Sequence, residues 1–166
     1  MLRTKQVLLV LLVALLHWPL PGLAERFRSE AHGFACSFPG SVEKSTVRTR
    51  DGLVLMSFMS LAPDNSWGAL VMTGFADPRE AASLGTWFRD FSVGLRGRGF
   101  LTANETFVRV EGRPAVKYSI SGDGVNGAGY VVIDEDRFVS INGMASVDKD
   151  QSMIEPFLKT LEILER

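Results

Sequence analysis

A thiol and an imidazole stand close together in the sequence, at Cys36 and His32. Such a pair acts as a nucleophile and its general base when the two side chains meet. In one extended strand, however, four residues separate them by roughly 13 Å. Cys36 also alternates with Phe34 and Phe38 on one strand face, where a free cysteine behaves as a small hydrophobe. We therefore expect a structural Cys36 and no catalytic residue, with a hydrolase as the weaker alternative.

Residues 122–127 spell G-D-G-V-N-G, which has the G-x-G-x-x-G spacing of a dinucleotide-binding loop. That loop needs a strand before it and a helix N-terminus after it, so that backbone amides meet the pyrophosphate. Here the β-rich segment 130–133 follows instead, which favours a hairpin loop. We expect no nucleotide and no other cofactor.

Acidic residues gather in two segments that a calcium ion could bridge: Asp134, Glu135, Asp136, Asp148 and Asp150. Asp148-Lys149-Asp150 resembles the start of a calcium loop. The sixth position of that loop holds Met153 rather than glycine, and the twelfth holds Lys159 rather than glutamate. Solvated turn charges and a helix cap explain these acids, so we expect no metal site.

Two tryptophans and two arginines are our candidates for a ligand or partner surface: Trp67, Trp87, Arg79 and Arg89. Trp87 lies at the margin of a predicted helical stripe, where an aromatic side chain can line a groove between helix and sheet. Core packing is the alternative for both tryptophans. For the arginines, together with Arg96 and Arg98, a solvated helix face is the alternative to an anionic partner.

The first 24 residues have the layout of a secretory signal peptide. Arg3 and Lys5 precede the apolar run 7–16, and Gly22-Leu23-Ala24 places small residues before a cleavage site. The run is shorter than the roughly 20 apolar residues that span a bilayer. We expect cleavage near Ala24, a periplasmic or secreted protein, and membrane contact only through this segment. An uncleaved N-terminal anchor is the alternative.

Charge and cysteine content exclude further classes. Removal of Arg3 and Lys5 with the signal peptide leaves 16 basic residues against 19 acidic ones, a net charge of −3. Nucleic-acid binding needs a basic surface, so we expect no such partner. With Cys36 as the only cysteine, no intramolecular disulfide forms, and the hydrophobic core must hold the fold.

Short strands joined by turns account for most of the remaining sequence. Alternating or fully apolar segments predict strands at 34–38, 42–49, 53–61, 68–75, 107–110, 115–121, 129–133 and 138–142. Asp51-Gly52 favours a hairpin between the second and third of these. Both faces of 53–61 are apolar, so we expect this strand to be covered on both sides.

Two helices complete the expected fold. Asp77, Pro78 and Glu80 have the types and spacing of a helix start, and apolar residues then recur every three or four positions up to Leu95. A closing helix is expected from Asp150, with Met153, Ile154, Phe157, Leu158 and Leu161 on its inner face, and Pro156 makes it short or kinked. We therefore predict an α+β fold. It is a single domain over residues 25–166, with one antiparallel sheet of about seven or eight strands and two main helices packed on it.

Two short segments resemble the PsbP-like group of exported bacterial proteins. Residues 33–40, G-F-A-C-S-F-P-G, are similar to the group's opening G-F-x-x-x-F-P-G segment, and residues 156–161, P-F-L-K-T-L, to its closing F-x-x-S/T-L motif. The resemblance covers most of residues 31–165. It implies an antiparallel sheet flanked by helices, and an accessory, assembly or binding protein rather than an enzyme.

These observations lead to two hypotheses about function. The first is a non-enzymatic, exported accessory domain that binds another envelope or secreted protein. The alternative is a small-ligand binding protein, with an apolar pocket between the 78–95 helix and the sheet near Trp87.

Overall fold

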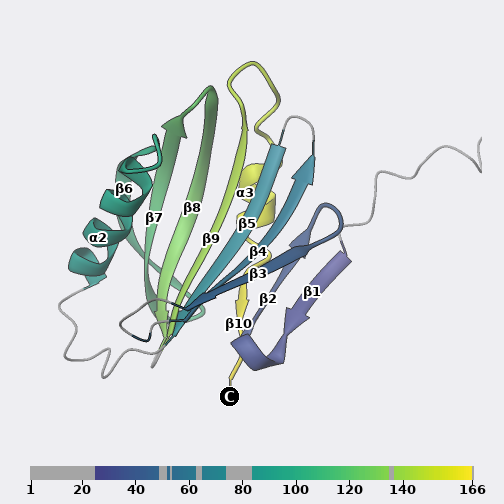
Figure 1. Cartoon of the computed structure of the whole chain (residues 1–166), viewed down its shortest axis with the longest axis vertical. Helices are drawn as coiled ribbons and strands as arrows, with labels where there is room; N and C mark the ends of the chain where they lie inside the picture. The colour runs from purple at the N-terminus through teal and green to yellow at the C-terminus, as the bar shows by residue number, and fades with distance from the viewer. Residues whose placement is uncertain are drawn as a thin grey trace, which may run out of the picture.

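Antiparallel strands dominate the computed structural model of the chain (Figure 1). The structure describes residues 25–48, 52, 54–62, 65–73, 84–134 and 137–165. The strands are β1 (Glu25–Ser29), β2 (Phe34–Phe38), β3 (Glu43–Arg48), β4 (Val54–Ala62), β5 (Asn65–Thr73), β6 (Leu101–Val110), β7 (Arg113–Gly122), β8 (Val125–Asp134), β9 (Arg137–Ser146) and β10 (Glu162–Ile163). A 3-10 turn, η1 (Glu30–His32), and two helices, α2 (Leu84–Arg96) and α3 (Ile154–Leu158), complete the described elements. None of the helices in this part of the chain is long and apolar enough to cross a membrane. The expected signal peptide, residues 1–24, lies outside the described residues.

The described strands form two sheets rather than the single sheet that we expected. A seven-stranded sheet has the order β3-β4-β5-β9-β8-β7-β6, and a three-stranded sheet has the order β1-β2-β10. The α+β class and the antiparallel pairing are confirmed, but the single sheet of seven or eight strands is wrong. The small sheet was missed because β1 is mostly polar and β10 has two residues. Neither has a strand pattern of its own, and both pair with β2.

The closing helix is shorter than we expected. It spans Ile154–Leu158, whereas we expected a helix that begins at Asp150 and includes Leu161. Met153 before it is exposed, and β10 follows at Glu162–Ile163. Pro156 was expected to shorten the helix, and Thr160 contributes a second cause. Its hydroxyl donates a hydrogen bond to the Phe157 carbonyl at 2.7 Å and accepts one from the Ser37 amide at 2.9 Å. These two bonds end the helix and attach it to β2.

The long helix ends at Arg96, one residue after Leu95, the last apolar position of the predicted stripe. The Phe100 amide bonds to the Leu95 carbonyl at 3.1 Å, and Gly99 between them has a φ of 88°. A residue with a side chain rarely adopts this conformation, which is common after helix ends. The predicted helix start at Asp77 and Pro78 lies outside the described residues.

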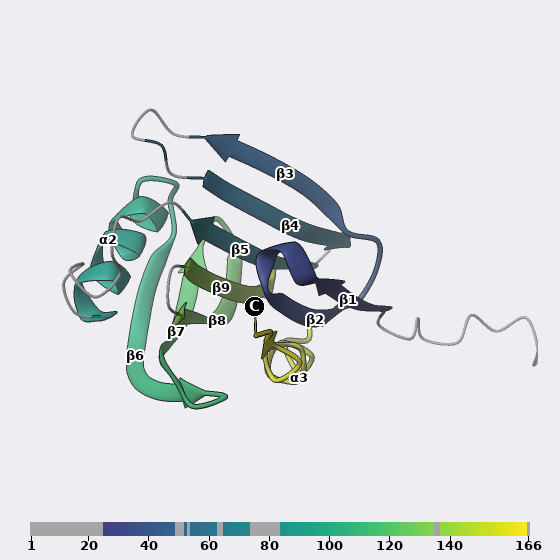
Figure 2. The same ribbon diagram turned by 90° about the horizontal axis from the view of Figure 1, so that it is seen from below.

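The two faces of the large sheet carry different elements (Figure 2). The three-stranded sheet and α3 lie on one face, and α2 lies on the other. On the first face, the rings of Phe27, Phe34 and Phe58 pack with centroids 5.1 to 5.8 Å apart. On the second face, Phe88 of α2 packs against Tyr118 of β7. The buried core is therefore divided by the sheet into two clusters.

A tight turn joins β7 to β8 at the G-x-G-x-x-G segment. Asp123 and Gly124 both have positive φ, 50° and 73°. Two positive φ values in a two-residue loop define the type I′ hairpin turn, for which Asp-Gly is a preferred sequence. The expectation of a hairpin at this segment is confirmed.

A buried arginine joins the two sheets. Arg137 of β9 is 2% exposed, and its guanidinium donates to the Asp134 carboxylate, to the His32 carbonyl at 3.2 Å and to the Leu164 carbonyl at 2.8 Å. Gly33 makes room for it, because a Cβ there would lie 1.3 Å from the Arg137 Nη1. Asp134 also accepts a hydrogen bond from Arg113. Sequence analysis placed Asp134 among solvated turn acids, whereas it is buried in this network.

We predict that Arg137→Ala lowers the free energy of unfolding by about 3–5 kcal/mol, because it leaves a buried carboxylate with one partner fewer and two carbonyls without a donor. Urea unfolding measures the loss. The control is Arg26→Ala, which removes an exposed ion pair with Glu162 and should cost about 1 kcal/mol or less. Equal losses in the two variants would contradict the role assigned to the buried network.

Candidate functional site

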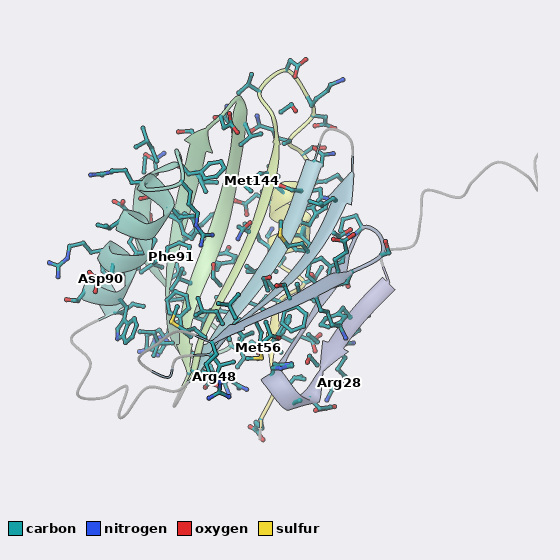
Figure 3. All side chains as sticks on the ribbon, in the orientation of Figure 1. Arg28, Arg48, Met56, Asp90, Phe91 and Met144 are labelled. Atoms are coloured by element: carbon teal, nitrogen blue, oxygen red, sulfur yellow. The ribbon has the colours of Figure 1, made fainter. Side chains whose placement is uncertain are left out.

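A cavity of about 550 Å³ lies between α2 and the large sheet. Its apolar wall comes from four strands and the segment after the helix, with side chains that include Leu55, Met59, Met72, Phe100, Ile120, Phe138 and Met144. Phe91 on α2 and Met144 on β9 are labelled in Figure 3. The cavity thus occupies the helix-covered face of the sheet and is separated by the sheet from the aromatic cluster under β1 and β2.

The helix contributes residues at helical spacing. The lining residues of α2 are Trp87, Asp90, Phe91, Gly94 and Leu95, and Arg98 lines the cavity just after the helix. Trp87, Phe91 and Leu95 are four positions apart, and Asp90 and Gly94 lie beside them, as residues on one side of a helix do. A Cβ at Gly94 would meet no atom within 4 Å. The helix therefore faces the cavity with aromatic rings at one end and with open space at Gly94.

The sheet makes room for the cavity with small residues in the interior of its strands. The register places Gly68 of β5 opposite Asn142 of β9, and Asn142 opposite Gly129 of β8. Gly129 in turn faces Tyr118 of β7, and a Cβ at Gly129 would lie 2.5 Å from the Tyr118 hydroxyl. Glycine in a strand commonly marks a place where another group approaches closely. Here that group is the phenol ring of Tyr118.

Uncharged polar side chains line the cavity on the sheet side at Ser57 of β4 and at Tyr118, Ser140 and Asn142. We call the last three the polar floor of the cavity. Neither the Tyr118 hydroxyl nor the Ser140 hydroxyl has a hydrogen-bond partner among the described residues. Burial raises the pKa of the Tyr118 phenol, and a hydrogen-bonding contact with Ser140, too poorly placed to count as a bond by distance and angle, lowers it by less. Tyr118 is therefore a neutral hydroxyl over the physiological pH range.

The structure places the two candidate tryptophans on opposite faces of the sheet. Trp87 lines the cavity and packs 6.3 Å from the ring of Phe138, centroid to centroid. Trp67 is 4% exposed and packs against Phe157 of α3 in the other cluster. Only one of the two tryptophans, Trp87, therefore contributes to the cavity.

The candidate arginines do not converge on the cavity. Arg89 is exposed on α2, with its side chain 3.9 Å from Asp90, and it does not belong to the lining. Arg79 lies outside the described residues. Arg98, which sequence analysis grouped with them, is exposed and lines the cavity after the end of α2.

Neither the thiol nor the acidic segments form a site in the described residues. Cys36 is buried in the first cluster, and burial raises the pKa of its thiol to about 12. The His32 ring lies 2.6 Å from the Ser29 hydroxyl. Among the residues described, no three His, Cys, Asp or Glu side chains are grouped closely enough to hold a metal ion.

The residues of the polar floor are not among the candidates that the sequence predicts. Ser140 and Asn142 alternate with Val139 and Ile141 in β9, and such alternation normally indicates a face open to solvent. The missing signal is the helix above that face, which turns the polar positions into cavity lining. Tyr118 lies in the predicted strand 115–121 and shares a face with Val116 and Ile120, but its unpaired hydroxyl has no signature in the sequence.

Comparison with known proteins supports the fold. No family model matches the chain, and no curated protein sequence matches it. Among solved structures, it is similar to the solution structure of cyanobacterial PsbP (CyanoP) from Synechocystis sp. PCC 6803. The TM-score is 0.62 at 8% sequence identity, over 89% of this chain and 95% of that chain. The chain therefore has a PsbP-like fold, as its resemblance to that group implied.

We predict that Cys36 is inert in the native protein. At about pH 8 a thiol with so high a pKa is almost entirely protonated, and the thiolate is the reactive form. An aromatic disulfide reagent should therefore label Cys36 orders of magnitude more slowly in buffer than in concentrated guanidinium chloride, as absorbance of the released thiolate reports. A Ser41→Cys, Cys36→Ala variant, with its thiol at an exposed position, is the control that reacts rapidly in both. Rapid native labelling of Cys36 would revive the nucleophile hypothesis.

Proposed function

We propose that this protein binds a small, mainly apolar molecule in the cavity between α2 and the large sheet. The observation that carries the proposal is the cavity itself, with a volume of about 550 Å³ and a lining of apolar and aromatic side chains around a few polar groups. Small-molecule sites are typically cavities of roughly 300–1,000 Å³ with this composition.

The energetics favour an occupant. Water makes no hydrogen bonds to the apolar side chains of the wall. A ligand that covers them gains about 25 cal/mol of binding free energy for each Å² of apolar surface removed from water. A ligand in the cavity would cover the aromatic rings and thioethers that line it. Trp87, Phe91 and Phe138 offer flat surfaces of the kind that stack on an aromatic or polycyclic molecule.

The expectation of a protein-binding accessory domain stays a prediction, and one observation favours it. Val47 of β3 and Leu61 of β4 are both more than half exposed. The strand register places Val47 opposite Leu55, and Leu61 lies two positions beyond Met59; Leu55 and Met59 both line the cavity. This exposed apolar edge beside the cavity is the surface that a partner protein would cover. That the protein has no catalytic activity also stays a prediction.

We propose further that the binding domain acts after export. The sequence of residues 1–24 supports a cleaved signal peptide. The first described strand, β1, spans Glu25–Ser29 and pairs with β2 along its length. Cleavage after Ala24 would leave this strand, and hence the three-stranded sheet, intact.

We predict that Gly94→Phe abolishes binding of an uncharged, apolar fluorescent probe such as N-phenyl-1-naphthylamine and leaves the fold unchanged. The added ring would enter the open space at Gly94, while loss of a helical glycine stabilises the helix by roughly 0.5–1 kcal/mol. Probe emission gives the affinity, and thermal unfolding gives the stability. Val93→Phe is the matched control, because Val93 is exposed on the same helix and does not line the cavity. It should leave probe affinity within about twofold of the wild type.

Equal binding in wild type and Gly94→Phe would place the probe elsewhere and contradict the ligand-binding proposal. Both substitutions leave Val47 and Leu61 unchanged, so a partner that docks on that edge would still bind to the Gly94→Phe variant.

We predict that protein recovered from its native cell fraction has an intact mass that begins at Glu25. Mass spectrometry of the purified native protein measures this directly. A mass that includes residues 1–24 would contradict cleavage and support the uncleaved anchor. Recovery with the cytoplasmic proteins would contradict export.

A further inference from the structure

Two buried hydroxyls at the polar floor have no partner. Tyr118 is 1% exposed and Ser140 is fully buried, and neither hydroxyl makes a hydrogen bond to any described residue. Both residues line the cavity. A buried polar atom without a partner is rare in native proteins, since its lost hydration is not replaced. Two such atoms at the wall of one cavity therefore indicate that the cavity's occupant supplies the partner.

The sheet geometry holds these two hydroxyls close together. The Tyr118 ring crosses β8 over Gly129, which has no side chain to block it, and so reaches towards β9. Ser140 lies on β9, and a hydrogen-bonding contact with it lowers the pKa of the Tyr118 phenol against the larger, raising effect of burial. By distance and angle the two hydroxyls are not paired, and a bond between them would use one of the two O–H donors and leave the other free. Asn142, two residues further on β9, adds a carboxamide to the same floor. A single oxygen atom of a ligand could meet both hydroxyls there.

The charges around the cavity indicate a neutral ligand. Among the described lining residues the charged side chains are Asp90 and Arg98, one of each sign, and both lie at exposed positions on or just after α2. The floor itself offers hydroxyl and amide groups without charge. An ionised group placed at the floor would have no counter-ion, and a buried charge is costly unless it is paired.

We propose that the ligand is an uncharged, mainly apolar molecule with a carbonyl or hydroxyl oxygen, which pairs with Tyr118 and Ser140. A carbonyl oxygen has two lone pairs, so it can accept a hydrogen bond from each hydroxyl at once. The apolar body then contacts the aromatic and aliphatic wall. This inference rests on the proposed ligand-binding function and names the chemical class that the site selects.

The test compares two probes that differ in one group. β-Acetylnaphthalene carries a ketone, and β-ethylnaphthalene has a methylene in its place. Equilibrium dialysis with chromatographic quantification gives the dissociation constant of each for the wild type, Tyr118→Phe and Ser140→Ala. We expect each substitution to weaken ketone binding roughly three- to tenfold, as the loss of one hydrogen bond does. Binding of the hydrocarbon should stay within about twofold. The charged analogue β-naphthoate should bind to the wild type at least about tenfold more weakly than the ketone.

Tyr130→Phe is the matched control. Tyr130 is the other tyrosine of the chain, and it packs with the cluster on the opposite face of the sheet. Removal of its hydroxyl should therefore change neither the affinity for the ketone nor the affinity for the hydrocarbon. Thermal unfolding checks the fold. Tyr118→Phe should be at least as stable as the wild type, because it removes a buried hydroxyl that has no partner.

The outcomes separate the two proposals. Suppose that the hydrocarbon binds and that the ketone binds to both hydroxyl variants as tightly as to the wild type. This result would overturn the hydrogen bonds proposed between the ligand oxygen and the two hydroxyls, and it would leave the ligand-binding function in place. Naphthoate affinity equal to that of the ketone would overturn the neutral ligand. Failure of all three probes to bind to the wild type would overturn the proposed function, and this inference with it.

Discussion

A guanidinium buried between the sheets sets the arrangement of the molecule. A charge at the depth of Arg137 costs several kcal/mol unless it is paired and hydrogen-bonded. The Asp134 carboxylate and the carbonyls of His32 and Leu164 meet this requirement together. Because those carbonyls follow β1 and β10, the first and last described strands have to lie against the end of the large sheet. The arrangement of the two sheets thus depends on the partners that one buried charge requires.

This constraint acts on one face of the large sheet and leaves the other free to vary. The face under β1 and β2 is filled by phenylalanine rings, Trp67 and the residues of α3, and close packing of that kind tolerates little change. The face under α2 carries the cavity and the two unpartnered hydroxyls. The filled core and the proposed binding cavity therefore lie on opposite faces of one sheet, which is why substitutions at the cavity can test binding without loss of the fold.

Local sequence patterns predicted the strands that a turn or an alternation defines by itself. Asp123-Gly124 and the alternating residues of β7 are examples, since their conformations depend on near neighbours. The small sheet could not be predicted in this way, because β1 and β10 are strands only through pairing with β2. The tryptophans show the same limit. Trp67 and Trp87 both follow polar or mixed segments, and only their positions in the three-dimensional fold separate a core residue from a cavity wall.

Glycines in the strand interiors explain how one sheet carries a filled face and a hollow one. On the filled face the Trp67 ring lies over Gly143, where a Cβ would approach it to 2.8 Å. On the hollow face Tyr118 covers Gly129 in the same manner. Gly68, however, faces Asn142, which is too short to cover it, and a Cβ there would be 3.3 Å from the Asn142 side chain. A large aromatic in place of Asn142 would complete the pattern and fill the cavity. The volume of the cavity therefore depends on a short polar side chain at one position of β9, opposite a glycine. The spacing of apolar residues in the sequence does not predict this pairing.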